Sequence, residues 1–395
     1  MTNSERIGAL KAEQARGILD ELDLDCWLIW VRETDQIADP AFRLVFDGDL
    51  VGRSALLFTR DGGRTAIVAG YDAGGLPDGA FDRVIGYDAG IRDALRSELA
   101  RIDPRTIAID VSRTDVGADG MTAGMRESLD ECLAGTPYRE RLVTAERLIG
   151  TLRGRKLAPE VERIRDAVRL TEQIFAAVFE RLAVGRTERE IHAMFHERVR
   201  EAGAGFAWSP GHNPAVDAGP DKAFGHLGPT DGRTRRGHLL HFDFGVRVDG
   251  YCSDLQRMVF FGKASEVPNE IADAFETVVG AIDAAAAALR PGAIGFEVDA
   301  KARVFLTDRG YPEYQHALGH QVGRNAHDGG VLLGPRWERY AGVVEGTVET
   351  GNVFTIEPNV PTETYGQVSL EEDVLVTKSG CEFLSAPQRE LICLP

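Results

Sequence analysis

A helix-opening pattern that occurs twice in the second half of the chain constrains the fold more than any other feature. Two segments of equal length, 185–203 and 292–310, each begin and end on glycine. Each follows a longer amphipathic pattern, at 159–182 and at 269–289, and each precedes apolar strand-like segments. The repeat predicts a duplicated unit of two helices followed by strands, with a functional site at the seam where strands of both halves meet.

The first part of the chain is organised differently, because strand-like and helix-like patterns alternate there. Apolar runs typical of strands occur at 26–31, 54–59, 65–69 and 106–110, and helical patterns occur at 6–22 and 90–101. This order predicts an α/β domain. Pro159 and Glu160 then suit the first turn of a long helix. With 395 residues, two domains are expected, and we place them at 1–153 and 154–395.

The net charge, the apolar runs and the cysteines restrict the partners and the cellular location that are expected for this chain. The net charge of -17 argues against nucleic acid or an anionic membrane as a partner. No apolar run approaches the ~20 residues that a membrane span needs, and the N-terminus has no signal-like apolar region. Five widely spread cysteines without metal-ligand spacing are expected to be reduced thiols, which predicts a cytoplasmic location.

Imidazole side chains are confined to the second half of the chain. All nine histidines lie at or after His192. Chemistry that needs imidazole is therefore expected in the repeated part of the chain.

Two aspartates flank a predicted hairpin. Asp243 interrupts the apolar strand 239–245, and Asp249-Gly250 is a strong hairpin turn signal. The return strand, 251–261, carries Asp254. A hairpin can bring both carboxylates to one place, where they repel each other unless a cation lies between them.

Acids recur in the second half of the repeat. Glu357 ends the apolar segment 353–356, and Glu371, Glu372 and Asp373 precede an apolar strand at 374–377. The residues alone do not choose among the three consecutive acids. Imidazole comes from His316 and His320, which are spaced as in zinc-binding helices. Gly319 argues instead for a strand or loop, where the backbone is approached closely.

A site rich in oxygen with one imidazole favours hard divalent cations. Mn or Co is expected, with Fe or Zn as further candidates. Two such ions can activate a shared water and polarise a carbonyl, which is the chemistry of amide hydrolysis.

These motifs together resemble the pita-bread metallopeptidases, in the branch of Xaa-Pro dipeptidase (prolidase), aminopeptidase P and creatinase. The resemblance rests on the segments 243–245, 250–254, 319–323, 355–358 and 371–377. It extends over essentially the whole chain. It implies an α/β (α+β) fold, with a creatinase-type N-terminal domain at 1–153 and a pita-bread catalytic domain with a pseudo-twofold repeat at 154–395.

The resemblance also assigns roles to residues. It implies that Asp243 binds one metal ion, that His320 and Glu357 bind the other, and that Asp254 and Glu371 bridge the two. It selects Glu371 among the three acids, because the family's last glutamate stands six residues before the threonine that ends the strand, here Thr377. The catalytic residues that it implies are Glu357 as proton shuttle together with His226, His316 and His327. It further implies a homodimer.

The expected function is hydrolysis of an amide bond in short peptides, as in Xaa-Pro dipeptidase or aminopeptidase P. Two positions depart from the family, which commonly has threonine at Gln256 and arginine at Ser369. Both border the expected metals and substrate. Two alternatives therefore stay open: an amidohydrolase or lyase that acts on a small non-peptide metabolite, and a non-catalytic binding protein with the same fold.

Overall fold

The computed structural model describes residues 3–220, 225, 227–340 and 342–395. It divides the chain into two compact units, Met1–Arg153 and Gly154–Pro395. All five cysteines lie in the described part, and each is a free thiol. Among the described residues, no helix is long and apolar enough to cross a membrane.

The first unit is built on a six-stranded mixed sheet with the strand order β4-β3-β2-β1-β5-β6. The strands are β1 (Cys26–Val31), β2 (Ser54–Thr59), β3 (Arg64–Ala69), β4 (Arg83–Tyr87), β5 (Ile107–Ile109) and β6 (Leu142–Thr144). The helices are α1 (Asn3–Glu21), α2 (Phe42–Val45), α3 (Gly70–Ala73), α4 (Arg92–Ile102), α5 (Ala123–Leu133) and α6 (Glu146–Gly154).

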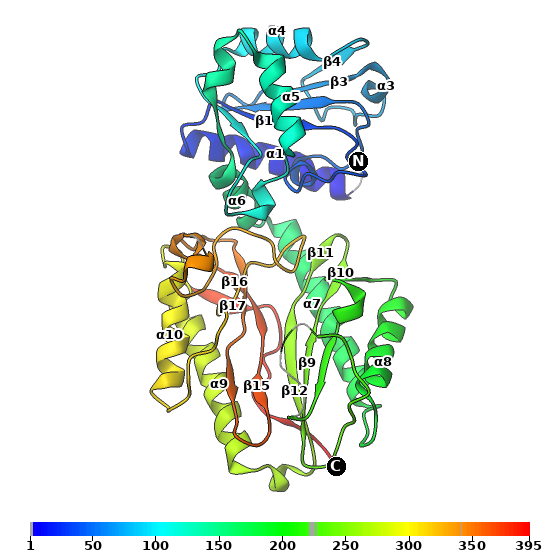
Figure 1. The fold of residues 1–395 in the computed structure, drawn as a ribbon, viewed down its shortest axis with the longest axis vertical. Coiled ribbons are helices and arrows are strands. Elements are labelled where there is room, and N and C mark those ends of the chain that lie inside the picture. Colours follow the sequence, from blue (N-terminus) through cyan, green and yellow to red (C-terminus); the bar gives the residue numbers. More distant parts are fainter. Residues whose placement is uncertain (1–2, 221–224, 226, 341) are drawn as a thin grey trace. The chain divides into compact units, whose positions relative to one another are not determined.

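Alternation along β1 explains why this sheet carries helices on both faces. Trp27 and Ile29 belong to a core cluster with residues of α1 and α6. Leu28 and Trp30 point the other way and belong to a second cluster with residues of α4 and α5. Figure 1 shows α1 and the pair α4 and α5 on opposite sides of the sheet. A strand that is apolar at every position is thus buried on both faces.

The second unit places two pairs of helices outside its strands, as Figure 1 shows with α7 and α8 in green and α9 and α10 in yellow. The helices are α7 (Ala158–Phe179), α8 (Glu188–Glu201), α9 (Asn269–Ala288) and α10 (Gly295–Thr307). Strands of its first half are β7 (Gly205–Phe206), β8 (Ala215–Ala218), β9 (Leu239–Phe244), β10 (Val246–Val248), β11 (Tyr251–Cys252) and β12 (Leu255–Phe261). Those that follow are β13 (Val353–Ile356), β14 (Asn359–Pro361), β15 (Gln367–Ser369), β16 (Glu372–Val376), β17 (Cys381–Phe383) and β18 (Ile392–Leu394).

The predicted repeat is visible in the hydrogen bonds that precede α8 and α10. The N–H of Gly185 donates to the carbonyl of Thr234 at 2.9 Å, and the N–H of Gly292 donates to the carbonyl of Val348 at the same distance. Both glycines have positive φ, 91° and 87°, so each adopts a conformation that a side chain disfavours. The predicted capping box is also present at α8, where Thr187 and Glu190 exchange hydrogen bonds.

The two halves meet through their strands. β8, β9, β12 and β18 form one sheet, and β13, β16 and β17 form another. An isolated antiparallel bridge between Gln256 and Glu371 joins them. One buried cluster contains Met258 of the first half and Phe354 of the second, together with residues of α9 and α10. The seam between the halves is therefore an ordered contact within one unit.

Candidate metal centre

Strict alternation along β9 sorts its side chains onto two faces. Phe242 and Phe244 pack against Phe175 of α7, with ring centroids 6.1 and 5.5 Å apart. His241 and Asp243, on the alternate positions, therefore face away from the helices. The sequence thus places one imidazole and one carboxylate on the inner face of the sheet.

The hairpin that follows keeps one register across its turn at Asp249 and Gly250. Asp243 lies opposite Gln256 in the pair β9–β12, and Asp254 lies in the break before β12. Asp243 and Asp254 are thus diagonal neighbours.

The expectation of one continuous return strand at 251–261 is wrong. The structure divides it at Ser253 and Asp254 into β11 and β12. The N–H of Asp254 donates to Asp373 Oδ2 at 3.1 Å instead of pairing with β9. A Cβ on the facing Gly245 would lie 2.0 Å from the Ser253 carbonyl, so the hairpin needs glycine there.

The second half supplies the remaining acids at equivalent strand ends. Glu357 directly follows β13, and Glu371 directly precedes β16. The backbones of Glu371 and Gln256 exchange two hydrogen bonds, of 3.3 and 3.4 Å. The carboxylate of Glu371 is thereby fixed at the seam.

His320 lies on a loop rather than a helix, as Gly319 indicated. A Cβ on Gly319 would lie 2.0 Å from the carbonyl of Thr355, and the N–H of His320 donates to Thr355 Oγ1 at 3.1 Å. The imidazole Nε2 is 3.8 Å from Asp254 Oδ2 and 3.5 Å from Glu357 Oε1. Ligand atoms of Asp254, His320 and Glu371 all lie within 4.8 Å of one another.

Electrostatics favour a cation in this cluster. Burial, followed by the neighbouring charge of Asp243, raises the pKa of both Asp254 and Glu357 well above the usual range. Burial and the charge of Asp254 do the same for the pKa of Glu371. Within the described residues, Glu371 Oε1 is buried and has no hydrogen-bond partner. Oxygen donors this close and this poorly neutralised suit a divalent cation.

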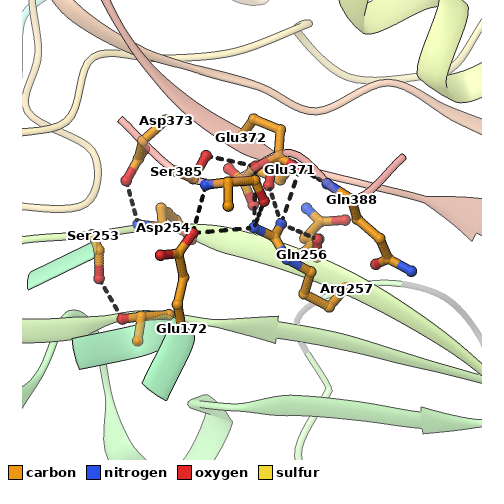
Figure 2. Close-up of polar contacts among 12 residues, drawn as sticks. Glu172, Ser253, Asp254, Gln256, Arg257, Glu371, Glu372, Asp373, Ser385 and Gln388 are labelled. Carbon is orange, nitrogen blue, oxygen red and sulfur yellow. Dashed lines mark hydrogen bonds and ion pairs between the residues drawn. The ribbon is translucent and has the colours of Figure 1, made fainter. Parts of the chain in front are cut away.

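The three consecutive acids have three different surroundings, which Figure 2 shows. Glu371 belongs to the cluster with Asp254 and His320. The carboxylate of Asp373 accepts the N–H of Asp254. Glu372 turns to the opposite face, where it accepts two hydrogen bonds of 3.1 Å from the guanidinium of Arg257. The assignment of Glu371 as a metal ligand itself stays a prediction.

The pair of Arg257 and Glu372 fastens the seam behind the cluster. Their side chains are 7% and 1% exposed. Arg257 Nη1 also donates to the carbonyls of Gln256 and Glu371, while Ser385 and Gln388 donate to the carboxylate of Glu372 (Figure 2). The pair therefore holds in register the two backbone segments that carry Asp254 and Glu371.

Replacing Arg257 with methionine is expected to lower the free energy of unfolding by about 3–5 kcal/mol, because the buried carboxylate of Glu372 loses its guanidinium. Urea unfolding measures the change. The matched control is Arg181→Met, which breaks an exposed pair with Glu197 and should cost less than about 1 kcal/mol. Equal small losses in the two variants would show that the buried pair does not fasten the seam.

The three other histidines that were predicted to be catalytic are His226, His316 and His327, and the structure describes the surroundings of the last two. His226 lies outside the described residues. The ring of His327 stands edge-on to that of His320, with centroids 4.2 Å apart. His316 Nε2 contacts the side-chain amide of Asn359 at 2.5 Å, and its Nδ1 contacts the carbonyl of Ala317 at 2.7 Å. Their catalytic roles stay predictions.

Sequence reasoning missed two buried residues near the cluster. His241 Nδ1 lies 2.9 Å from Asp217 Oδ2, and His241 Nε2 lies 2.9 Å from Gln256 Oε1. A signal was present for His241, since it stands two positions before Asp243 and so shares its face of the strand. No comparable signal marks Asp217, because its place beside His241 depends on the pairing of β8 with β9.

Comparison with known proteins gives a consistent result. The model of metallopeptidase family M24 matches residues 162–378. The chain is 31% identical to an Xaa-Pro dipeptidase of Pyrococcus furiosus over 62% of its own length and 67% of that protein's. It is also 31% identical to an Xaa-Pro dipeptidase of Pyrococcus horikoshii, over 60% of this chain and 64% of the relative. The structure of an Xaa-Pro dipeptidase from Bacillus anthracis superposes with a TM-score of 0.76 at 20% identity, covering 98% of this chain and 100% of the other. That similarity confirms the predicted pita-bread fold.

Proposed function

Because this chain belongs to metallopeptidase family M24, we propose that it hydrolyses the amide bond of short peptides, with Xaa-Pro dipeptides as the preferred class. The observation that carries the proposal is the cluster of Asp254, His320 and Glu371, which brings ligand atoms from both halves within 4.8 Å. The two Pyrococcus relatives, both Xaa-Pro dipeptidases, support the choice of peptide.

Family membership implies divalent metal ions, and the donor set fits them. We propose two ions, Mn or Co by preference, with Fe or Zn as further candidates, held by Asp243, Asp254, His320, Glu357 and Glu371. When bound, such ions polarise an amide carbonyl and activate water for attack. The chain's own contribution is to hold five donors from both halves in a fixed arrangement.

Glu357 is the candidate proton carrier of the reaction. Its carboxylate lies 3.5 Å from the imidazole of His320. A carboxylate at this position can accept a proton from water and return it to the leaving amine. We propose that His327, an exposed residue whose ring stands edge-on to that of His320, donates an N–H to negative charge on the substrate oxygen. His226 and His316 are proposed to contact the substrate.

A second function remains a candidate because of Gln256 and Ser369. Both are buried neutral side chains next to the cluster, where the family commonly has threonine and arginine. An amidohydrolase or lyase that acts on a small non-peptide metabolite would use the same metals with a differently shaped substrate. We also propose a homodimer in the cytoplasm, which light scattering and fractionation would check.

A substrate panel separates these functions. Xaa-Pro dipeptides, longer Xaa-Pro peptides and small cyclic amides are assayed side by side with Mn²⁺, and the purified protein is analysed for bound metal. We expect metal binding and the highest kcat/KM on Xaa-Pro dipeptides. Turnover of cyclic amides alone would favour the metabolite enzyme. Absence of both bindable metal and turnover would overturn the proposed function.

A further inference from the structure

Four buried polar side chains from four strands form a chain of contacts that ends at Glu357. The members are Asp217 of β8, His241 of β9, Gln256 of β12 and Ser369 of β15, and their residues are 7%, 4%, 5% and 1% exposed. Burial of this many polar groups is unfavourable unless each is hydrogen-bonded. The hydrogen bonds among these side chains therefore indicate which group on the inner face of the sheet is kept in a fixed orientation.

Gln256 is the branch point of this chain. Its Oε1 accepts a hydrogen bond of 2.6 Å from the hydroxyl of Ser369 and lies 2.9 Å from Nε2 of His241. Its Nε2 donates to Glu357 Oε2 at 3.4 Å. An ionised carboxylate only accepts hydrogen bonds, so the amide nitrogen, not the oxygen, must face Glu357. Ser369 and His241 thus fix which way the amide points.

The side chains of Gln256 and Ser369 form one structural feature. Gln256 and Ser369 lie on different strands, yet their side chains are in direct contact. Loss of the Ser369 hydroxyl would leave the oxygen of Gln256 with one partner fewer, so that only the contact with His241 Nε2 would fix the orientation of its amide. A change at either position is therefore expected to act on the same third group, the carboxylate of Glu357.

The two oxygens of Glu357 are held by different partners. Oε1 lies 3.5 Å from His320 Nε2 and 3.5 Å from Thr355 Oγ1, whereas Oε2 is held by Gln256. Oε1 therefore faces His320 of the cluster, and Oε2 accepts a hydrogen bond from the neutral amide of Gln256. Partners that orient a metal-binding carboxylate strongly affect metal affinity.

We propose that Gln256 is a positioning residue that orients Glu357 for metal binding and turnover, and that Ser369 acts on the reaction only through Gln256. The inference rests on the proposed function, in which Glu357 binds metal and carries a proton. It goes beyond that function by assigning a specific task to two buried residues that contact neither metal nor substrate in the proposed function.

The test compares Gln256→Met, which keeps length but removes the amide, with Ser369→Ala, Ser369→Thr and the double variant Gln256→Met/Ser369→Ala. Calorimetric titration of the metal-free proteins with Mn²⁺ and steady-state kinetics on an Xaa-Pro dipeptide are both recorded. We expect Gln256→Met to weaken Mn²⁺ binding about 10–100-fold and to lower kcat more than it changes KM. Ser369→Ala should show a smaller loss, which Ser369→Thr restores.

The double variant gives the sharpest outcome. If Ser369 acts through Gln256, the double variant should bind Mn²⁺ no more weakly than Gln256→Met alone, because effects within one network are not additive. Additive losses would overturn the shared route. Gln173→Met, on an exposed position of α7, controls for loss of a glutamine amide and should leave affinity and kcat unchanged.

Failure of the proposed function and failure of the positioning role of Gln256 give different experimental results. A wild-type protein that neither binds Mn²⁺ nor hydrolyses peptide overturns the proposed function, and this inference with it. A wild-type protein that does both, together with a Gln256→Met variant of unchanged Mn²⁺ affinity and kcat, overturns the positioning role alone. Should Gln256→Met not fold, full Mn²⁺ affinity in the folded Ser369→Ala variant would equally overturn it.

Discussion

Replacing Asp254 with alanine is expected to abolish peptide hydrolysis and to remove most of the bound metal. Asp254 contributes a ligand atom to the only group of described residues that meets the geometry of a metal site, and its side chain is 7% exposed. Removing it leaves only His320 and Glu371 of that group. We expect a loss of at least about 1,000-fold in kcat/KM, which corresponds to about 4 kcal/mol of transition-state stabilisation.

The measurements are metal content per chain and kcat/KM on an Xaa-Pro dipeptide. Asp283→Asn is the matched control, because Asp283 is an exposed acid of α9 that pairs with Arg389. It should retain both metal and activity. Full activity of Asp254→Ala would overturn the assignment of the metal centre, and full metal content with lost activity would place Asp254 in catalysis alone.

The second large effect is the pH dependence of stability. Protonation of the cluster is expected to stabilise the metal-free protein as the pH falls, whereas the Mn²⁺-loaded protein is expected to lose stability as the pH falls. In the metal-free state the pKa values of Asp254, Glu357 and Glu371 are raised by burial and by one another. The folded protein then binds more protons than the unfolded chain, so its stability is lost as pH rises through the raised pKa values.

Metal reverses the sign of this dependence. Divalent ions bind the deprotonated carboxylates, so their stabilising contribution falls as protons compete at low pH. Thermal unfolding at several pH values, with and without Mn²⁺, measures both trends. The contribution of the cluster to Tm is expected to be larger at pH 5 than at pH 8 in the metal-free protein and smaller at pH 5 than at pH 8 in the Mn²⁺-loaded protein.

A matched variant is needed because the first unit contains its own buried acids. Burial also raises the pKa of Asp39 and Asp110, which contributes a trend of the same sign. Asp254→Asn removes one charge from the cluster and leaves that pair unchanged. Metal-free Asp254→Asn should therefore be more stable than the metal-free wild type at pH 8 and show a flatter pH dependence. Identical profiles would mean that the cluster does not set the trend.

Secondary structure in this chain was largely predictable because local patterns agree with tertiary burial. The expected strands at 26–31 and 54–59 are β1 and β2 with the same bounds. Helix ends were less predictable: the pattern at 292–310 gives a helix of Gly295–Thr307 only. The residues before Gly295 pair with another segment at Thr347 instead of joining the helix, and such pairing leaves little local signal.

The residues that approach one another in the candidate site were largely predictable from the sequence, whereas the buried contacts that hold them were not. Asp243 and Asp254 follow from a hairpin signal, and Gly319 indicates the loop of His320. Their roles as metal ligands stay predictions. By contrast, the contact of Gln256 with Ser369 joins residues far apart in the chain, and only the packing of β12 against β15 creates it. The same holds for Arg257 and Glu372, whose pairing follows from the seam and not from either segment alone.

The bridge between Gln256 and Glu371 joins two segments that each carry part of the proposed metal site. Asp243 and Asp254 come from one half of the repeat, whereas His320, Glu357 and Glu371 come from the other. Metal ions held by all five residues, as proposed, would link the two halves, and their binding free energy would add to the stability of the contact between the halves.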